Sequence, residues 1–308
     1  MKRQQIAIIG SGISGLTCAY LLHEQHDITV FESNDYIGGH TNTVEIEHLE
    51  QALQVDTGFI VSNDRNYSNF LKLMSELGVA LQPTEMSFSV TNKELNLEYN
   101  GHNVNTLFSQ RRNFFRPHFY RLVFDILKFN KMSKALVGKD LDAQLTLGDF
   151  TRASNLSDTF KDNYLLPMVA AIWSCSLKQA EDFPIEFFLR FFHNHGLLDI
   201  KNRPQWYVIK GGSKAYIEPL TANFRQRIKL KCPVTSVERA QSSITVNHAK
   251  GSSNFDQIIF ACHSDQALAL LSEPNEDEQT VLSGLSYQEN DVIPVSYTHL
   301  TLPTIYSV

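Results

Sequence analysis

The feature that most constrains the fold of this chain is a glycine motif near its amino terminus. An apolar run at 6–9 leads into Gly10, Gly12 and Gly15 in the pattern Gly-x-Gly-x-x-Gly, and a second apolar run at 28–31 ends in Glu32. This order predicts a strand, a helix and a second strand, with the glycines at the first turn. Such a unit is typical of a doubly wound α/β fold that binds a dinucleotide at the carboxyl edge of a parallel sheet.

Each glycine of the motif meets a physical requirement. Gly10 permits a tight turn, Gly12 lets the backbone approach a diphosphate without a Cβ, and Gly15 lets the helix pack closely on the strand. The helix begins at Ile13 and Ser14, where free N–H groups and the positive end of the helix dipole favour phosphate oxygens. The sequence therefore predicts that residues 10–15 bind the diphosphate of a dinucleotide.

The residues that follow favour FAD over a nicotinamide dinucleotide. Glu32 follows the last glycine by 17 residues, close to the usual interval for an acid that binds ribose hydroxyls. Gly38 and Gly39 come soon afterwards, followed by His40 and Thr41. A second glycine pair predicts another backbone approach to the same diphosphate, which an ordinary nicotinamide domain does not need. The alternative is a loop that merely turns, because glycine pairs are common in turns.

These motifs resemble those of the flavin amine oxidase superfamily, which includes phytoene desaturases and protoporphyrinogen oxidases. The segments GHTNT (39–43), DTGFIV (56–61) and EMSFSV (85–90) are similar to a branch of mostly bacterial FAD-dependent oxidoreductases, and the similarity extends to about residue 290. The resemblance implies a Rossmann-like FAD/NAD(P)-binding domain of the GR2 type with an inserted α+β substrate domain. It also implies an enzyme that moves a hydride from its substrate to N5 of FAD.

By the motif and the resemblance together, the predicted cofactor-binding residues are Gly10, Gly12, Ile13, Ser14, Gly15, Glu32, Gly38, Gly39, His40, Thr41, Gly58 and Val234. The resemblance assigns to Val234 a backbone contact with adenine. No residue is assigned as a catalytic base, because none of these motifs requires one. Two other functions stay open: a nicotinamide-dependent dehydrogenase, and a non-catalytic protein that binds nucleotides or lipids.

The tripeptide Asp56-Thr57-Gly58 also occurs in aspartic proteases. Here Phe59 follows where a small hydroxyl residue would be expected, and the chain has no second copy to supply the partner carboxylate of a proton-sharing pair. We therefore interpret 55–61 as a strand and turn that pass near the flavin ring, with Gly58 allowing close approach.

Composition excludes several other classes of protein. The chain has 308 residues, 43% of them hydrophobic, which is enough for two domains, and its net charge of −6 does not favour nucleic acid. No run of eighteen apolar residues occurs, and Gly10 and Gly12 interrupt any signal-type run. The four cysteines lack metal or redox spacing, so we expect no metal site and a cytoplasmic location.

The predicted domains are discontinuous. Residues 1–83 and 205–270 form the expected FAD-binding domain, and residues 84–204 and 271–292 form the expected helical substrate domain. The last residues, 293–308, include VSYTHLTLPT, which resembles translated sequencing-adapter sequence. We expect this tail to be non-native and the full-length product to be longer, so that the present chain binds FAD poorly. The alternative is a natural, shortened protein.

The expected substrate domain contains a basic, aromatic-rich segment, Arg111 to Lys134. It holds seven Lys or Arg residues against one acid, Asp125, and positions 116, 120, 123, 124, 127 and 131 recur at helical spacing. One interpretation is a helix that lies on an anionic membrane surface, and the other is a domain helix with an apolar face on the core. Nucleic-acid binding is disfavoured because no reader motif accompanies the charge.

Two further residues of this domain are candidates for function. Trp173 is either a wall of a substrate cavity or part of the core, and His195 is either an acid or base or a structural residue. The aromatic composition of the domain weakly favours a small, hydrophobic substrate. The sequence does not indicate an oligomeric state.

Overall fold

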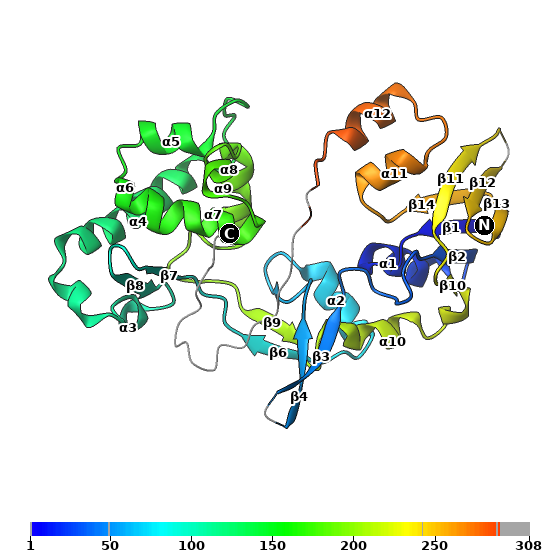
Figure 1. The fold of residues 1–308 in the computed structure, drawn as a ribbon, viewed down its shortest axis with the longest axis horizontal. Coiled ribbons are helices and arrows are strands. Elements are labelled where there is room, and N and C mark those ends of the chain that lie inside the picture. Colours follow the sequence, from blue (N-terminus) through cyan, green and yellow to red (C-terminus); the bar gives the residue numbers. More distant parts are fainter. Residues whose placement is uncertain (1, 49, 242, 288, 290–308) are drawn as a thin grey trace. The chain divides into compact units, whose positions relative to one another are not determined.

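The computed structural model describes residues 2–48, 50–241, 243–287 and 289, which form two compact units (Figure 1). Within this part of the chain, unit 1 consists of 2–61, 69–82 and the residues from 208 onward, and unit 2 consists of 62–68 and 83–207. After a first crossing into unit 2 at 62–68, the chain leaves unit 1 again within β6 (Leu81–Thr84) and returns to it within β9 (Trp206–Ile209). Unit 2 is therefore an insertion into unit 1.

Unit 1 is built on a four-stranded sheet with the order β10-β2-β1-β14. The strands are β10 (Ile228–Lys229), β2 (Asp27–Phe31), β1 (Gln5–Ile9) and β14 (Gln257–Phe260). All neighbouring pairs run parallel, and Ile6 of β1 pairs with Ile28 on one side and Gln257 on the other. The carboxyl ends of the four strands therefore lie at one edge of the sheet, as the glycine motif predicts.

The two faces of this sheet are covered differently (Figure 1). Ile6 and Ile8 belong to a core cluster with residues of α1 (Ile13–Leu22), α2 (Ser68–Glu76) and α10 (Ile217–Thr221). Ala7 points to the opposite face, because side chains alternate along a strand, and it packs with Phe31 against an antiparallel sheet. That sheet has the order β11-β12-β13, with β11 (Val234–Arg239), β12 (Ile244–His248) and β13 (Gly251–Phe255).

Strand β13 ends at Phe255 and β14 begins at Gln257, so only Asp256 separates the two strands. The predicted strand and turn at 55–61 correspond to the end of a hairpin, β3 (Thr43–His48) and β4 (Gln51–Asp56), and to residues 57–61, which lie outside any strand. Strand β13 has the sequence GSSNF, which lacks the alternating apolar residues that mark a half-buried strand.

The assignment of 271–292 to the second domain is wrong for its described residues, which belong to unit 1. They follow α11 (Ser264–Leu270) and include α12 (Glu276–Ser283). The N–H of Ser272 donates to the carbonyl of Val237 at 3.0 Å, and Arg239 forms an ion pair with Glu278 at 2.5 Å. Both contacts attach the segment to β11. The predicted non-native tail, 293–308, lies outside the described residues.

Acid is expected to loosen α12. The hydrogen bond from Arg239, with a backbone hydrogen bond from Asn275, lowers the pKa of Glu278 from 4.5 to about 2. A carboxylate with a lowered folded pKa stabilises the fold above its unfolded pKa and loses that contribution as the pH falls from 4.5 toward 2. Amide exchange in 276–283 should rise across this window, and Arg239→Gln should raise it at neutral pH. Equal exchange in Arg239→Gln and the parent chain would contradict this.

Unit 2 consists of a hairpin and helices around an aromatic core. The hairpin is β7 (Ser89–Asn92) with β8 (Leu97–Asn100), and a short strand β5 (Ser62–Asn63) pairs with the start of β9. The helical elements are α3 (Val104–Leu107), the 3₁₀ helix η1 (Arg111–Phe115), α4 (Pro117–Leu136), α5 (Leu147–Ala153), α6 (Asp158–Phe160), the π-helical η2 (Lys161–Leu165), α7 (Leu166–Trp173), α8 (Leu177–Glu181) and α9 (Ile185–Asn194).

The core of unit 2 is dominated by phenylalanine side chains that solvent does not reach. They come from α4, α6 and α9 and are Phe119, Phe129, Phe160, Phe188 and Phe192. This aromatic packing accounts for the apolar composition that the sequence shows in 84–204. In the part of the chain that the structure describes, no helix is both long enough and apolar enough to cross a membrane.

Candidate functional site

The predicted site residues meet at the carboxyl edge of the parallel sheet in unit 1. Gly10 follows β1, Glu32 follows β2, and Ala261 follows β14. Strand β1 lies between β2 and β14, so the chain leaves β1 at the point where the strand order reverses. Ligands of doubly wound folds bind at this point, because the connections on either side diverge and leave a crevice.

Two glycines of the motif are required by the packing of the protein itself. Gly10 has a φ of 104°, and a Cβ on it would lie 2.6 Å from the carbonyl oxygen of Ala261. A Cβ on Gly15 would lie 2.0 Å from the carbonyl oxygen of Gly10. These approaches are far below van der Waals distance, so no side chain fits at either position. Gly10 and Gly15 hold the first strand, the first helix and the loop after β14 together.

Gly12 differs from every other glycine, all of which lie in the described part of the chain. Its φ of −67° is one that any residue adopts, and a Cβ on it would meet no atom within 4 Å. Each other glycine has either a positive φ or an atom of the protein within 4 Å of the added Cβ. Nothing in the fold itself therefore requires glycine at position 12. A ligand that approaches the backbone of Gly12 would require it.

Gly12 is also the residue before α1, and no side chain caps that helix. The first turn, including Ile13 and the exposed Ser14, therefore has N–H groups without intrahelical acceptors. These donors, together with the helix dipole, suit phosphate oxygens. The residues present thus fit the diphosphate of a dinucleotide.

The second glycine pair lies directly beside the first loop. Gly38 forms an isolated parallel bridge with Gly12, and a Cβ on Gly39 would lie 3.2 Å from the Cα of Gly12. Gly38 and Gly39 have φ values of 130° and 58°, which favour glycine. The N–H of Gly38 donates to Oγ of Ser11 at 3.3 Å. The sequence interpretation of two glycine loops acting at one place agrees with this arrangement.

Glu32 has a structural role that sequence reasoning did not anticipate. Its side chain is only 6% exposed, and Oε2 accepts hydrogen bonds from the N–H of Ser11 at 3.0 Å and from its hydroxyl at 2.6 Å. Oε1 accepts from the N–H of Asn34 at 2.9 Å. The carboxylate therefore fixes the glycine loop. A carboxylate offers about four acceptor sites, so a contact with ribose would share oxygens already in use.

His40 and Thr41 point to different surroundings. Thr41 is buried and its hydroxyl is hydrogen-bonded to the hydroxyl of Tyr216. The exposed ring of His40 stacks on His263, with ring centroids 5.8 Å apart, and His263 stacks on Tyr287 at 4.3 Å. His263 follows β14 and was not predicted, although its place in a polar loop after a strand was a signal. It adds a second imidazole to the sheet edge.

The segment Asp56-Thr57-Gly58 supports the glycine loops. Oδ1 of Asp56 accepts from the hydroxyl of Thr43 at 2.6 Å, and from both the N–H and the hydroxyl of Ser213 at 2.8 Å. A Cβ on Gly58 would lie 2.2 Å from the carbonyl oxygen of His40. The close approach at Gly58 is therefore to His40. Whether Gly58 also contacts the flavin stays a prediction.

Replacement of Asp56 by alanine is expected to destabilise unit 1 by roughly 2–3 kcal/mol, because two buried residues lose their hydrogen-bond acceptor. The donors left without it are Thr43 and Ser213. The free energy of unfolding in urea measures the effect. Asp35→Ala is the control, since the Asp35–Lys231 pair is exposed, and it should change stability by less than about 0.5 kcal/mol. Equal stabilities of the two variants would contradict the structural role of Asp56.

Val234 follows a segment that is hydrogen-bonded to Glu32. The N–H of Cys232 donates to the carbonyl of Glu32 at 2.8 Å, so the chain passes beside Glu32 two residues before β11 begins. Val234 is half-buried at the start of that strand. The contact with adenine itself stays a prediction.

In unit 2 the structure favours structural roles for Trp173 and His195. Trp173 packs against five phenylalanine rings of the 183–192 region, at centroid distances of 4.8–6.4 Å. Both ring nitrogens of His195 are engaged, Nδ1 with the carbonyl of Phe191 at 2.9 Å and Nε2 with the amide nitrogen of Asn66 at 3.0 Å. Because protein groups hold both nitrogens, neither is free for proton transfer.

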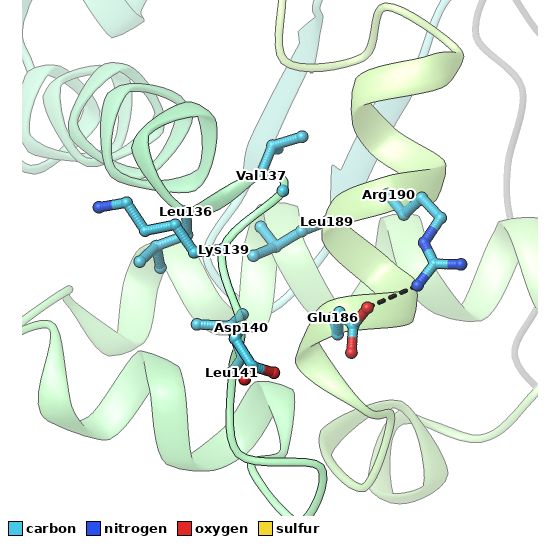
Figure 2. Close-up of a pocket in the computed structure, with 9 residues that line it drawn as sticks. Leu136, Val137, Lys139, Asp140, Leu141, Glu186, Leu189 and Arg190 are labelled. Atoms are coloured by element: carbon cyan, nitrogen blue, oxygen red, sulfur yellow. Dashed lines mark hydrogen bonds and ion pairs between the residues drawn. The ribbon is translucent and has the colours of Figure 1, made fainter.

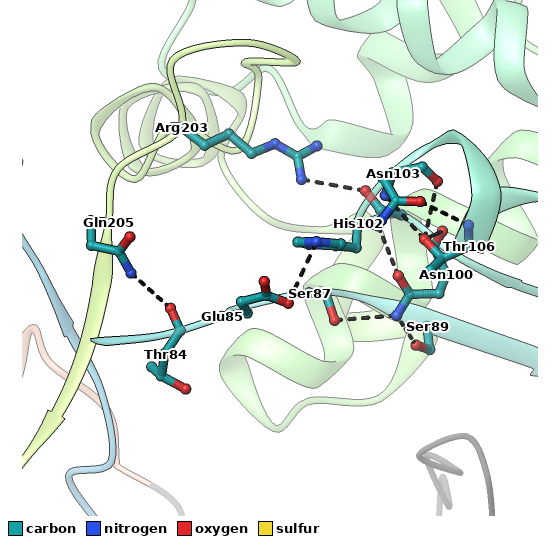
Figure 3. Close-up of polar contacts among 11 residues, drawn as sticks. Thr84, Glu85, Ser87, Ser89, Asn100, His102, Asn103, Thr106, Arg203 and Gln205 are labelled. Atoms are coloured by element: carbon teal, nitrogen blue, oxygen red, sulfur yellow. Dashed lines mark hydrogen bonds and ion pairs between the residues drawn. The ribbon is translucent and has the colours of Figure 1, made fainter. Parts of the chain in front are cut away.

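The EMSFSV segment at 85–90 is held by polar contacts with the turn after β8 (Figure 3). Glu85 forms an ion pair with His102 at 3.4 Å, and the amide of Asn100 donates to the hydroxyls of Ser87 and Ser89 at 3.2 and 2.7 Å. Arg203 donates to the carbonyl of Gly101 at 3.3 Å. These contacts fix the hairpin, and they assign no chemistry to this motif.

A cavity of about 450 Å³ lies in unit 2 between the end of α4 and α9 (Figure 2). Leu136, Val137, Leu141 and Leu189 form its apolar part, and an ion pair between Glu186 and Arg190 at 2.5 Å lies beside it. None of the predicted site residues lines this cavity. Among the described residues, no group of His, Cys, Asp and Glu could hold a metal ion.

The comparisons with known proteins bear on the family of this chain. The family model for flavin-containing amine oxidoreductases matches residues 13–304. Flavin-containing amine oxidase A of the dog, Canis lupus familiaris, is 26% identical over 277 residues, which cover 79% of this chain and 47% of that enzyme. The chain thus spans about half the length of this curated relative.

Solved structures show the same fold. Cyclohexylamine oxidase from Brevibacterium oxydans superposes with a TM-score of 0.70 at 18% identity, covering 92% of this chain and 63% of that one. Putrescine oxidase with bound putrescine gives a TM-score of 0.69 at 16% identity, with the same coverage. The match of the family model over nearly the whole chain, together with the glycine loops at the sheet edge, shows that this chain belongs to the flavin-containing amine oxidoreductase family.

Proposed function

We propose that this chain supplies the FAD-binding part of an oxidoreductase that moves a hydride from a small, hydrophobic substrate to N5 of the flavin. Gly12 carries the proposal. The fold does not require glycine at this position, which lies at the uncapped start of a helix and beside a second glycine pair. A diphosphate that approaches the bare backbone accounts for all three facts. Membership of a flavin-containing family supports FAD as the dinucleotide.

The residues of unit 1 have separate roles in this proposal. The N–H groups at the start of α1 and the backbone of Gly12, Gly38 and Gly39 bind the diphosphate, and Glu32 fixes the loop and shares its carboxylate with a ribose hydroxyl. The backbone of Val234 contacts adenine. When bound, the flavin supplies the hydride acceptor, and the protein supplies position and electrostatics.

The substrate is proposed from composition and family. Unit 2 presents an aromatic core and a partly apolar cavity, which support a hydrophobic substrate. The names of the relatives support oxidation of a C–N bond, with reoxidation by oxygen or another acceptor. The chain has no assigned catalytic base. We propose a cytoplasmic location, and contact with a membrane surface through 111–134 is argued below.

Ligand titration of the purified chain tests the proposed cofactor. FAD is expected to bind weakly but saturably, with a change in flavin absorbance, and ADP is expected to compete, because the residues named bind the ADP half of the cofactor. Tighter binding of NAD than of FAD, seen as quenching of protein fluorescence, would favour the nicotinamide-dependent alternative. FAD that binds but that no donor reduces would favour a non-catalytic protein.

A further inference from the structure

Helix α4 has two aromatic faces, of which only one is buried. Phe119, Leu122 and Phe129 form the buried face and pack in the core of unit 2. Tyr120, Phe124 and Leu127 are exposed, and their spacing of four and three residues places them on one side of the helix. Phe124 is 66% exposed. Of the positions that recur at helical spacing in the sequence, 120, 124 and 127 therefore face solvent.

The 3₁₀ helix before α4 extends this surface. Phe115 is 89% exposed, and the neighbouring Phe114 stacks on Phe108 with ring centroids 4.2 Å apart. The hydroxyl of Tyr120 donates to the carbonyl of Phe114 at 3.1 Å, which connects η1 to the first turns of α4. We refer to Phe114, Phe115, Tyr120, Phe124 and Leu127 as the aromatic face.

The charges around the aromatic face are positive and largely uncompensated. In the described part of the chain, only two of the seven cations in 111–134 pair with an acid: Arg121 with Asp125 at 3.8 Å and Lys134 with Asp199 at 2.7 Å. The other five are Arg111, Arg112, Arg116, Lys128 and Lys131. Asp125, the only acid in the segment, is buried and accepts from the N–H of Ser157 at 3.1 Å.

Several of these cations are oriented by neutral oxygens. Arg111 donates to the side chain of Asn105 at 2.7 Å, Arg116 donates to the carbonyl of Asn96 at 2.9 Å, and Lys128 donates to the carbonyl of Ser154 at 2.8 Å. An amide oxygen directs a cation without neutralising it. The segment therefore keeps a concentrated positive charge, although the whole chain has a net charge of −6.

We propose that the aromatic face docks on the surface of a bilayer that contains anionic phospholipid. Exposed aromatic rings beside unpaired Lys and Arg match the two layers of such a surface, because the rings enter the boundary of the acyl chains and the cations meet the phosphates. A nucleic acid would match the positive charge of this segment. It would not explain why the apolar ring of Phe115 is exposed, and the net negative charge of the chain disfavours it. The docking does not depend on FAD.

Flotation of the full 308-residue chain with lipid vesicles tests the proposal. The chain should bind vesicles of phosphatidylcholine and phosphatidylglycerol in equal parts, bind pure phosphatidylcholine much more weakly, and be released as salt screens the charges. The double variant Phe115→Ser/Phe124→Ser should bind at least about tenfold more weakly, because two aromatic rings no longer enter the lipid. Both residues are well exposed, so the variant should fold.

Val281→Ser is the matched control, because Val281 is a similarly exposed apolar residue, at 68%, on α12 in unit 1. It should leave vesicle binding unchanged. Equal binding of the parent chain and the double variant would overturn the proposal. So would salt-sensitive binding of single-stranded RNA without vesicle binding, or a self-association that the double variant abolishes while vesicles have no effect.

Discussion

Replacing Gly12 with valine is expected to weaken FAD binding by about 100-fold or more and to change the stability of the chain by less than about 1 kcal/mol. The two effects separate because the space beside Gly12 contains no atom of the protein within 4 Å, and its φ of −67° suits any residue. A valine side chain would occupy the space into which the diphosphate must come. Titration with FAD measures the first effect, and urea unfolding the second.

Gly284→Val is the control for this substitution. Gly284 lies at the end of α12 with a φ of −70°, and a Cβ on it would meet only ordinary contacts at 3.4 Å. It should bind FAD like the parent chain. If Gly12→Val also bound FAD like the parent chain, the diphosphate would not lie at Gly12. The proposed function would then lose the observation on which it depends.

Replacing Gly15 with alanine should have the opposite result, a loss of stability of about 3 kcal/mol or more. The added Cβ would lie 2.0 Å from the carbonyl oxygen of Gly10 and 3.2 Å from the Cβ of Ala261. The new methyl group would meet a backbone atom of Gly10, so no flexible side chain can move aside to make room. Helix α1 must therefore move away from β1. Urea unfolding followed by circular dichroism measures the loss.

Gly12→Ala is the matched control, because it adds the same methyl group three residues away, where space is open. It should unfold at nearly the same urea concentration as the parent chain. If Gly15→Ala and Gly12→Ala unfolded together, the close packing of α1 on the glycine loop would be wrong.

The glycine loops could be predicted because their pattern of spacing is short and recognisable. Gly10, Gly15, Gly38 and Gly39 meet requirements of the fold and Gly12 leaves room for a ligand, and the spacing along the sequence identifies all five although the contact of Gly10 with Ala261 is distant in the sequence. The partners of Glu32 are harder to predict. Its type and distance from the last glycine indicate ribose, whereas its bonds to Ser11 depend on how β1 and β2 align.

Other features were missed because the decisive contact lies far away in the sequence or leaves no pattern. The hairpin of β3 and β4 turns through Glu50, which has a φ of 62° although it is neither glycine nor asparagine. The segment after 270 attaches to unit 1 through the ion pair of Arg239 and Glu278, and nothing in the sequence indicates that these two residues pair. In α4 both faces carry aromatic residues, so periodicity alone could not say which face is buried.

The pairing of β1 with β14 has a consequence for how the protein is made. The N–H of Gln5 donates to the side chain of Asp256, which lies 251 residues later in the sequence. Strand β1, which leads into the glycine loop, therefore has no partner strand on that side until β14 has been synthesised. At typical ribosomal speeds this delay is on the order of 10–50 s. The described part of unit 2 ends at residue 207, so its helices can fold during translation before β14 is made. Until then one edge of β1 stays unpaired, exposed to the ribosome or to a chaperone.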